Sequence, residues 1–77
     1  MAYIRGRYPN RLRHYRHMAG LTIKQLAQET GIAPNTILQY ELGTTDMSLF
    51  RAIDLCKVLD ITVEALVAPE EEADREV

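Results

Sequence analysis

Two amide side chains, Asn35 and Gln39, lie four residues apart in the segment PNTILQYELG. Residues four apart share one face of a helix, so both amides would project in the same direction. An amide offers a hydrogen-bond donor beside an acceptor, which matches N6 and N7 at the edge of adenine. These residues could therefore recognise a polar edge by hydrogen bonding. The alternative is that both are solvated residues on an exposed helix.

The flanking residues predict two short helices around this segment. Thr22 and Gln25 have the spacing of a capping box that opens a helix over residues 22–29, and Gly31 ends it. Pro34 suits the first position of the next helix, which runs to Gly43, because its missing N–H has no partner there anyway.

Three more helices are predicted in the rest of the chain, with no convincing strand, so the fold class is all-α. The first covers residues 10–19, is capped by Asn10 and places Leu12, Tyr15, Arg16 and Ala19 on one face. The fourth covers residues 48–59, is capped by Ser48 and points Leu49, Ala52, Ile53, Cys56 and Leu59 inward. A short fifth helix begins at Thr62 and carries Leu66.

Four residues around the central turn fit a helix-turn-helix. Ala27 is small enough for the two helices to approach, and Gly31 tolerates positive φ in the turn. Ile32 follows as an apolar plug, and Ile37 is the inward β-branched residue of the second helix. In such a motif the second helix enters the major groove of DNA and the first lies across the backbone.

The segments NRLRHYRHMAGLTIKQLAQETGIAPNTILQYELG and SLFRAIDLCKVLDITVEAL resemble the Cro/repressor (XRE-like) family of helix-turn-helix proteins. The resemblance covers residues 10–67 and implies a five-helix, lambda-repressor-like DNA-binding domain over 10–68. The family pattern implies base contacts by Pro34, Asn35, Leu38 and Gln39, with Thr36 placed to bond a phosphate. It also implies an ion pair between Arg16 and Glu41, for which two unrelated surface charges are the alternative.

The charge is distributed unevenly along the chain. The net charge is −2, yet residues 1–24 sum to +6 and residues 69–77 to −4. We interpret residues 1–9 as a basic arm and 69–77 as an acidic disordered tail, either side of the folded domain. A basic first third suits contact with a polyanion, and the candidate phosphate contacts are Arg5, Arg7, Arg11, Arg13 and Lys24.

Composition excludes several other classes of protein. The single cysteine, Cys56, excludes an internal disulfide, and its apolar surroundings predict a buried thiol. No Cys/His cluster has zinc-ligand spacing, so we expect no metal and no cofactor, and His14 and His17 lack the partners an enzyme would need. No apolar run has the length of a membrane span or a signal peptide. We expect a cytoplasmic protein that is not an enzyme.

Two functions remain open. The first is a transcriptional regulator, expected to be a repressor, that binds double-stranded DNA as a homodimer. Val63, Val67 and Leu42 are the candidates for the dimer contact, and packing within their own chain is the alternative for the two valines. The second is a protein-binding helix-turn-helix module, such as an antiactivator or an antitoxin. Ile23, where relatives commonly carry Gln, the acidic Asp46 in the loop and the lack of a cation in the 34–42 helix favour the second.

Overall fold

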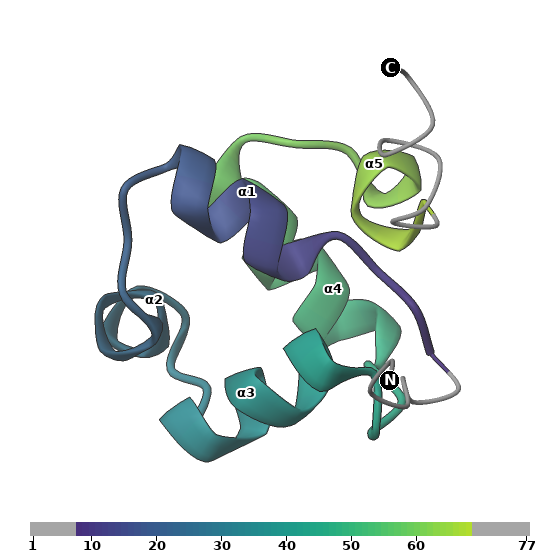
Figure 1. Cartoon of the computed structure of the whole chain (residues 1–77). Helices are drawn as coiled ribbons and strands as arrows, with labels where there is room; N and C mark the ends of the chain where they lie inside the picture. The colour runs from purple at the N-terminus through teal and green to yellow at the C-terminus, as the bar shows by residue number, and fades with distance from the viewer. Residues whose placement is uncertain (1–7, 69–77) are drawn as a thin grey trace, which may run out of the picture.

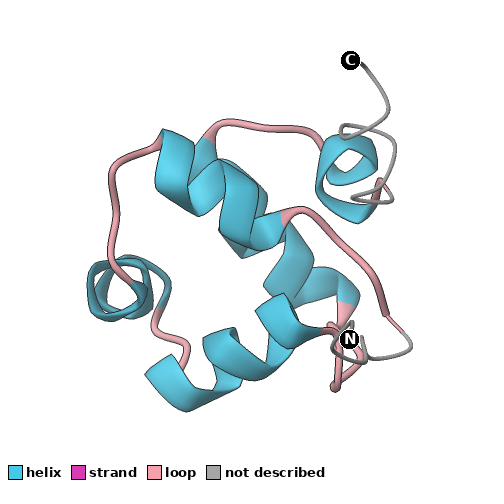
Figure 2. Cartoon of the chain, viewed as in Figure 1, coloured by secondary structure: helices cyan, strands magenta, loops and turns pink. Residues whose placement is uncertain are grey.

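The computed structural model describes residues 8–68, and within that range the chain is built from helices and loops alone (Figure 2). The five helices are α1 (Leu12–Met18), α2 (Ile23–Thr30), α3 (Pro34–Leu42), α4 (Leu49–Leu59) and α5 (Val63–Val67). The all-α, five-helix fold expected from the sequence is confirmed. The predicted arm and tail lie almost entirely outside the described residues.

One hydrophobic core joins all five helices. Each helix contributes a fully buried side chain, and the turn between α2 and α3 adds a sixth: Leu12, Leu26, Ile32, Ile37, Leu55 and Leu66. Burying a side chain of this size stabilises the fold by about 1.5–3 kcal/mol, so these six residues fix the relative positions of the helices.

The predicted helix ends around α2 and α3 are confirmed. Thr22 accepts a hydrogen bond from the Gln25 N–H at 3.0 Å, and the Gln25 side chain accepts from the Thr22 N–H at 2.8 Å. Gly31 and Gly43 end the two helices with φ of 77° and 75°, values that a residue without Cβ adopts at little cost. Local contacts therefore set both ends of α2 and the C-terminal end of α3.

The first helix is shorter than expected. Asn10 still stabilises the start of this helix, because its Oδ1 accepts a hydrogen bond from the Leu12 N–H at 2.9 Å. The Arg11 N–H instead donates to the carbonyl of Leu66 at 2.7 Å, which draws the chain toward α5 before the helix begins. At the other end Ala19 is exposed, so its predicted place on the buried face is wrong.

The buried face of α4 also differs from the prediction. Leu49 is 63% exposed, whereas Leu55 is fully buried. Ala52, Leu55, Cys56 and Leu59 form the inner face of this helix. The inward position predicted for Ala52, Cys56 and Leu59 is confirmed, the one predicted for Leu49 is wrong, and Leu55 was missed because both faces of α4 carry apolar residues.

The helices are arranged so that the candidate DNA-binding pair stands apart from the C-terminal helix. Figure 1 shows α2 and α3 along one side of the molecule, α1 and α4 through the middle, and α5 on the opposite side. None of the helices in residues 8–68 has the length and apolar character needed to cross a membrane.

Candidate nucleic-acid interface

Helix α3 is held by one face and exposes the other. Ile37 and Tyr40 are buried in the core, at 0% and 5% exposure. The side chains predicted to contact bases lie on the opposite face and are all exposed: Pro34, Asn35, Leu38 and Gln39. Thr36 lies between the two faces and is half-buried. The four residues expected from the resemblance therefore form one continuous outward row.

The turn before α3 fixes its angle against α2. Ala27 and Ile32 are buried where the two helices approach. The Thr30 hydroxyl donates to the Leu26 carbonyl at 2.9 Å and accepts from the Ile32 N–H at 3.2 Å. These contacts make the helix-turn-helix a rigid unit, as base recognition requires.

Arg16 and Glu41 form an ion pair between α1 and α3. The Arg16 Nε donates to Glu41 Oε2 at 2.6 Å and the second nitrogen to Oε1 at 3.2 Å, a two-pronged contact that is buried. Arg16 also donates to the Leu21 carbonyl at 2.9 Å. A buried pair of this geometry fixes orientation more than it adds stability. It therefore fixes the end of α3 relative to α1.

Gln39 has a partner that the sequence did not reveal. Its side-chain oxygen accepts a hydrogen bond at 3.0 Å from the hydroxyl of Thr45, in the loop between α3 and α4. Asn35 has no side-chain hydrogen bond to any residue between 8 and 68. The two amides of the outward row therefore differ in their hydrogen bonding within the described chain.

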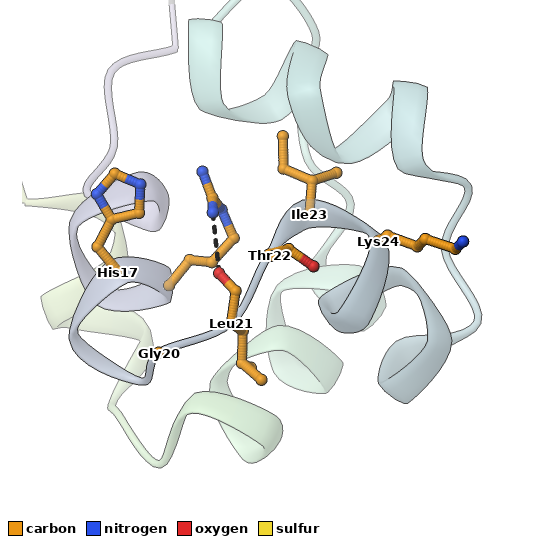
Figure 3. A pocket seen from close by; sticks show the side chains of 7 residues that line it. His17, Gly20, Leu21, Thr22, Ile23 and Lys24 are labelled. Carbon is orange, nitrogen blue, oxygen red and sulfur yellow. Dashed lines mark hydrogen bonds between the residues drawn. The ribbon is translucent and has the colours of Figure 1, made fainter.

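Two basic side chains lie beside the start of α2. Lys24 and His17 line a shallow hollow of about 620 Å³ on the surface. Figure 3 shows them on either side of the loop that joins α1 to α2. A second hollow connects Lys24 to Pro34 at the start of α3. Lys24 is therefore well placed for a phosphate contact next to the outward row. His17 was not among the predicted contacts, and it reaches this hollow from α1.

The two arginines of α1 differ in their surroundings. Arg13 is exposed. The guanidinium of Arg11 lies 5.2 Å from the centre of the Tyr15 ring and donates to the Tyr15 hydroxyl at 3.4 Å. Its backbone contact with Leu66 also places it next to α5. Arg11 is thus engaged within its own chain, while Arg5 and Arg7 lie outside the described residues.

The residues predicted to form a dimer contact differ in exposure. Val63 is half-buried and packs on the core, whereas Val67 is 53% exposed. A surface hollow places Val67 beside Met47 and Ala52, at the start of α4. The most exposed apolar side chain of the described chain, Phe50 at 79%, follows at that same end of the helix, next to Leu49.

The cysteine and the histidine considered as reactive or metal-binding residues pack against other side chains. Cys56 is buried, and burial raises the pKa of its thiol, which disfavours the reactive thiolate. His14 packs edge-on against Tyr15. Within residues 8–68 no three His, Cys, Asp or Glu side chains gather in a way that could hold a metal ion.

Comparison with known proteins assigns the family. The profile of the Helix-turn-helix family matches residues 12–66, which is most of the chain. This protein belongs to the XRE-like helix-turn-helix family. A curated relative, an uncharacterised HTH-type transcriptional regulator of Methanocaldococcus jannaschii, is 32% identical over 63 residues, which are 82% of this chain and 96% of the relative.

Two solved structures resemble this helix-turn-helix protein. The restriction-modification controller protein C.AhdI from Aeromonas hydrophila superposes with a TM-score of 0.68 and 31% identity, over 71% of this chain and 83% of that one. A hypothetical transcription factor from Neisseria gives a TM-score of 0.72 at 18% identity, over 86% and 76% of the two chains, and supports the fold alone. The XRE-like protein is thus a DNA-binding transcriptional regulator and not an enzyme.

Proposed function

We propose that this helix-turn-helix protein is a sequence-specific repressor that binds a palindromic operator as a homodimer. The observation that carries the proposal is the outward row of α3, formed by the exposed side chains of Pro34, Asn35, Leu38 and Gln39. The buried Ile37 and Tyr40 hold the helix to the core. Among the described residues nothing occupies the donor and the acceptor of the Asn35 side chain, the pair that matches adenine, and Leu38 offers an apolar contact for a thymine methyl.

Phosphate contacts orient the row in the groove. Lys24 is the best-supported candidate, because it lies in the first turn of α2 and beside the start of α3. Arg13 and Thr36 are the further candidates on the described helices, and Arg5 and Arg7 would extend the contact along the arm. Arg11 is the weakest of these candidates, because its side chain is already bound to Tyr15.

Two copies of the chain would present two α3 helices to successive major grooves. A two-fold dimer binds two half-sites about 34–36 Å apart, and because the same symmetry relates the two half-sites, the expected operator is palindromic. Val67, Leu49 and Phe50 supply an exposed apolar surface for such an association, on elements other than α2 and α3. A dimer that occupies a promoter would repress by excluding the polymerase.

Selection of genomic DNA fragments by the purified protein, at near-physiological salt, tests the proposal. We expect enrichment of one palindromic sequence, and a reporter gene controlled by that sequence should be less active when the protein is present. Recovery of fragments without a common sequence would contradict specific recognition. Because C.AhdI is a controller protein, a site near a restriction-modification locus is a reasonable first place to look.

The surface also supports a second candidate, a protein-binding module that uses the same fold. Within residues 8–68, α3 carries no cation, and the loop that follows it exposes the acidic side chain of Asp46. The exposed Phe50 would suit an apolar contact with a different protein. Stable copurification with the product of a neighbouring gene, together with no enrichment of DNA in the selection, would favour this function.

A further inference from the structure

The loop after α3 folds back onto Gln39 through three hydrogen bonds. The backbone N–H and the hydroxyl of Thr44 both donate to the Gln39 backbone carbonyl, at 3.1 and 3.2 Å. The hydroxyl of Thr45 then donates to the Gln39 side-chain oxygen at 3.0 Å. The loop is itself anchored, because the Tyr8 N–H donates to the Gly43 carbonyl at 3.1 Å. Thr45 is therefore held at a fixed place relative to the end of α3.

This contact changes what Gln39 can offer to a base. A free glutamine presents a donor and an acceptor together, which matches adenine N6 and N7. The side-chain oxygen keeps a second lone pair, but its bond to Thr45 directs it toward the loop. The NH₂ group, which only donates, is therefore the end of the side chain that remains for the groove. Guanine presents two adjacent acceptors, N7 and O6, in the major groove, whereas adenine presents one acceptor and one donor.

We infer that Thr45 is a positioning residue that makes Gln39 select guanine rather than adenine. The inference rests on the proposed function, because it specifies one base pair of the same interface. Asn35, four residues earlier on the same face, has no side-chain hydrogen bond to any residue within 8–68, so it keeps the adenine preference of a free amide. Each half-site would then contain an adenine opposite Asn35 and a guanine opposite Gln39.

The hydrogen bond from Thr45 to Gln39 is strong enough to favour guanine over adenine without excluding adenine. Gln39 is exposed, and a hydrogen bond of this kind contributes about two- to tenfold to an equilibrium. To accept from adenine N6 while its NH₂ group donates to N7, Gln39 would have to turn its oxygen away from Thr45. Guanine can be bound without that release, so we expect the protein to favour guanine by about that factor from this contact.

Four proteins test the inference by selection from randomised duplex DNA followed by affinity measurement. Gln39→Ala identifies the base pair, since its preference should disappear there alone. Thr45→Val keeps the shape of the side chain and removes the hydroxyl, and Thr45→Ser restores the hydroxyl. We expect guanine for the wild type and for Thr45→Ser, and a shift of about two- to tenfold toward adenine for Thr45→Val. A general loss of structure in Thr45→Val would weaken binding to every sequence and would not exchange one base for another.

The outcomes separate this inference from the proposed function. If the wild type selects a sequence but prefers a base other than guanine opposite Gln39, the inference is wrong and the regulator function stands. An unchanged guanine preference in Thr45→Val would also overturn the role of Thr45. If the wild type enriches no sequence at all, the proposed function itself fails.

Discussion

The Arg16 guanidinium and the Glu41 carboxylate, 25 residues apart in the sequence, meet in a buried ion pair between α1 and α3, with 2.6 Å between Nε and Oε2. Glu41 is in the last turn of α3, one residue after the buried Tyr40. The contact therefore fixes the helix that carries the candidate base contacts relative to α1. A change at either residue would act on DNA binding through the angle of α3, without touching DNA.

Removal of one partner of this pair should be costly, because it leaves the other charge buried without compensation. We expect Glu41→Leu or Arg16→Met to lower the free energy of unfolding by about 3–5 kcal/mol, and the double variant to be more stable than the sum of the two losses predicts. Urea denaturation of the four proteins measures the coupling. Strictly additive losses would show that the ion pair does not act as a unit.

Asn35 should contribute to specific binding and little to binding of random DNA. We expect Asn35→Ala to weaken binding to the selected operator by about 1–3 kcal/mol, because one paired amide contact is lost. Affinities for the operator and for a scrambled duplex of equal length, measured at one salt concentration, provide the comparison. An equal loss on both duplexes would contradict base recognition by this residue.

Lys24 should contribute to binding of every DNA sequence. Each phosphate contact that is lost should lower the slope of log K against log salt by about one, so Lys24→Ala should show that change. Lys57→Ala is the matched control, because it removes the same charge from an exposed position in the last turn of α4. If the two variants show the same slope, Lys24 acts only through net charge and makes no contact of its own.

The features that the sequence predicted correctly depend on neighbours along the chain. The capping box of Thr22 and Gln25, the turn at Gly31 and the inward Ile37 are set within a few residues, so local patterns suffice to find them. The Arg16–Glu41 pair is a long-range contact, and its expectation came from the family resemblance alone. The structure now provides its geometry.

The features that could not be predicted from the sequence depend on tertiary packing, which decides the direction of each side chain. Leu49 and Leu55 are both leucines on α4, and only the packing of α4 against its neighbours decides that Leu55 is the buried one. Arg11 stays a predicted phosphate contact, but the position of its guanidinium over the Tyr15 ring could not be foreseen from the sequence. The bond from Thr45 to Gln39 depends on the path of a loop, which no helical periodicity describes.

The exposed apolar residues at the start of α4 and the end of α5 give the last prediction, on assembly. If Phe50 and Val67 lie in a two-fold contact, Phe50→Ser and Val67→Ser should each raise the dimer dissociation constant by about tenfold or more, because each removes apolar area that association would bury. Met18→Ser is the matched control, since Met18 is 74% exposed at the end of α1.

Sedimentation equilibrium measures the dimer dissociation constants, and a chain ending at residue 68 should still dimerise. Equal effects of Met18→Ser and Phe50→Ser would show that Phe50 is not part of the contact, and loss of the dimer on truncation would assign assembly to residues 69–77.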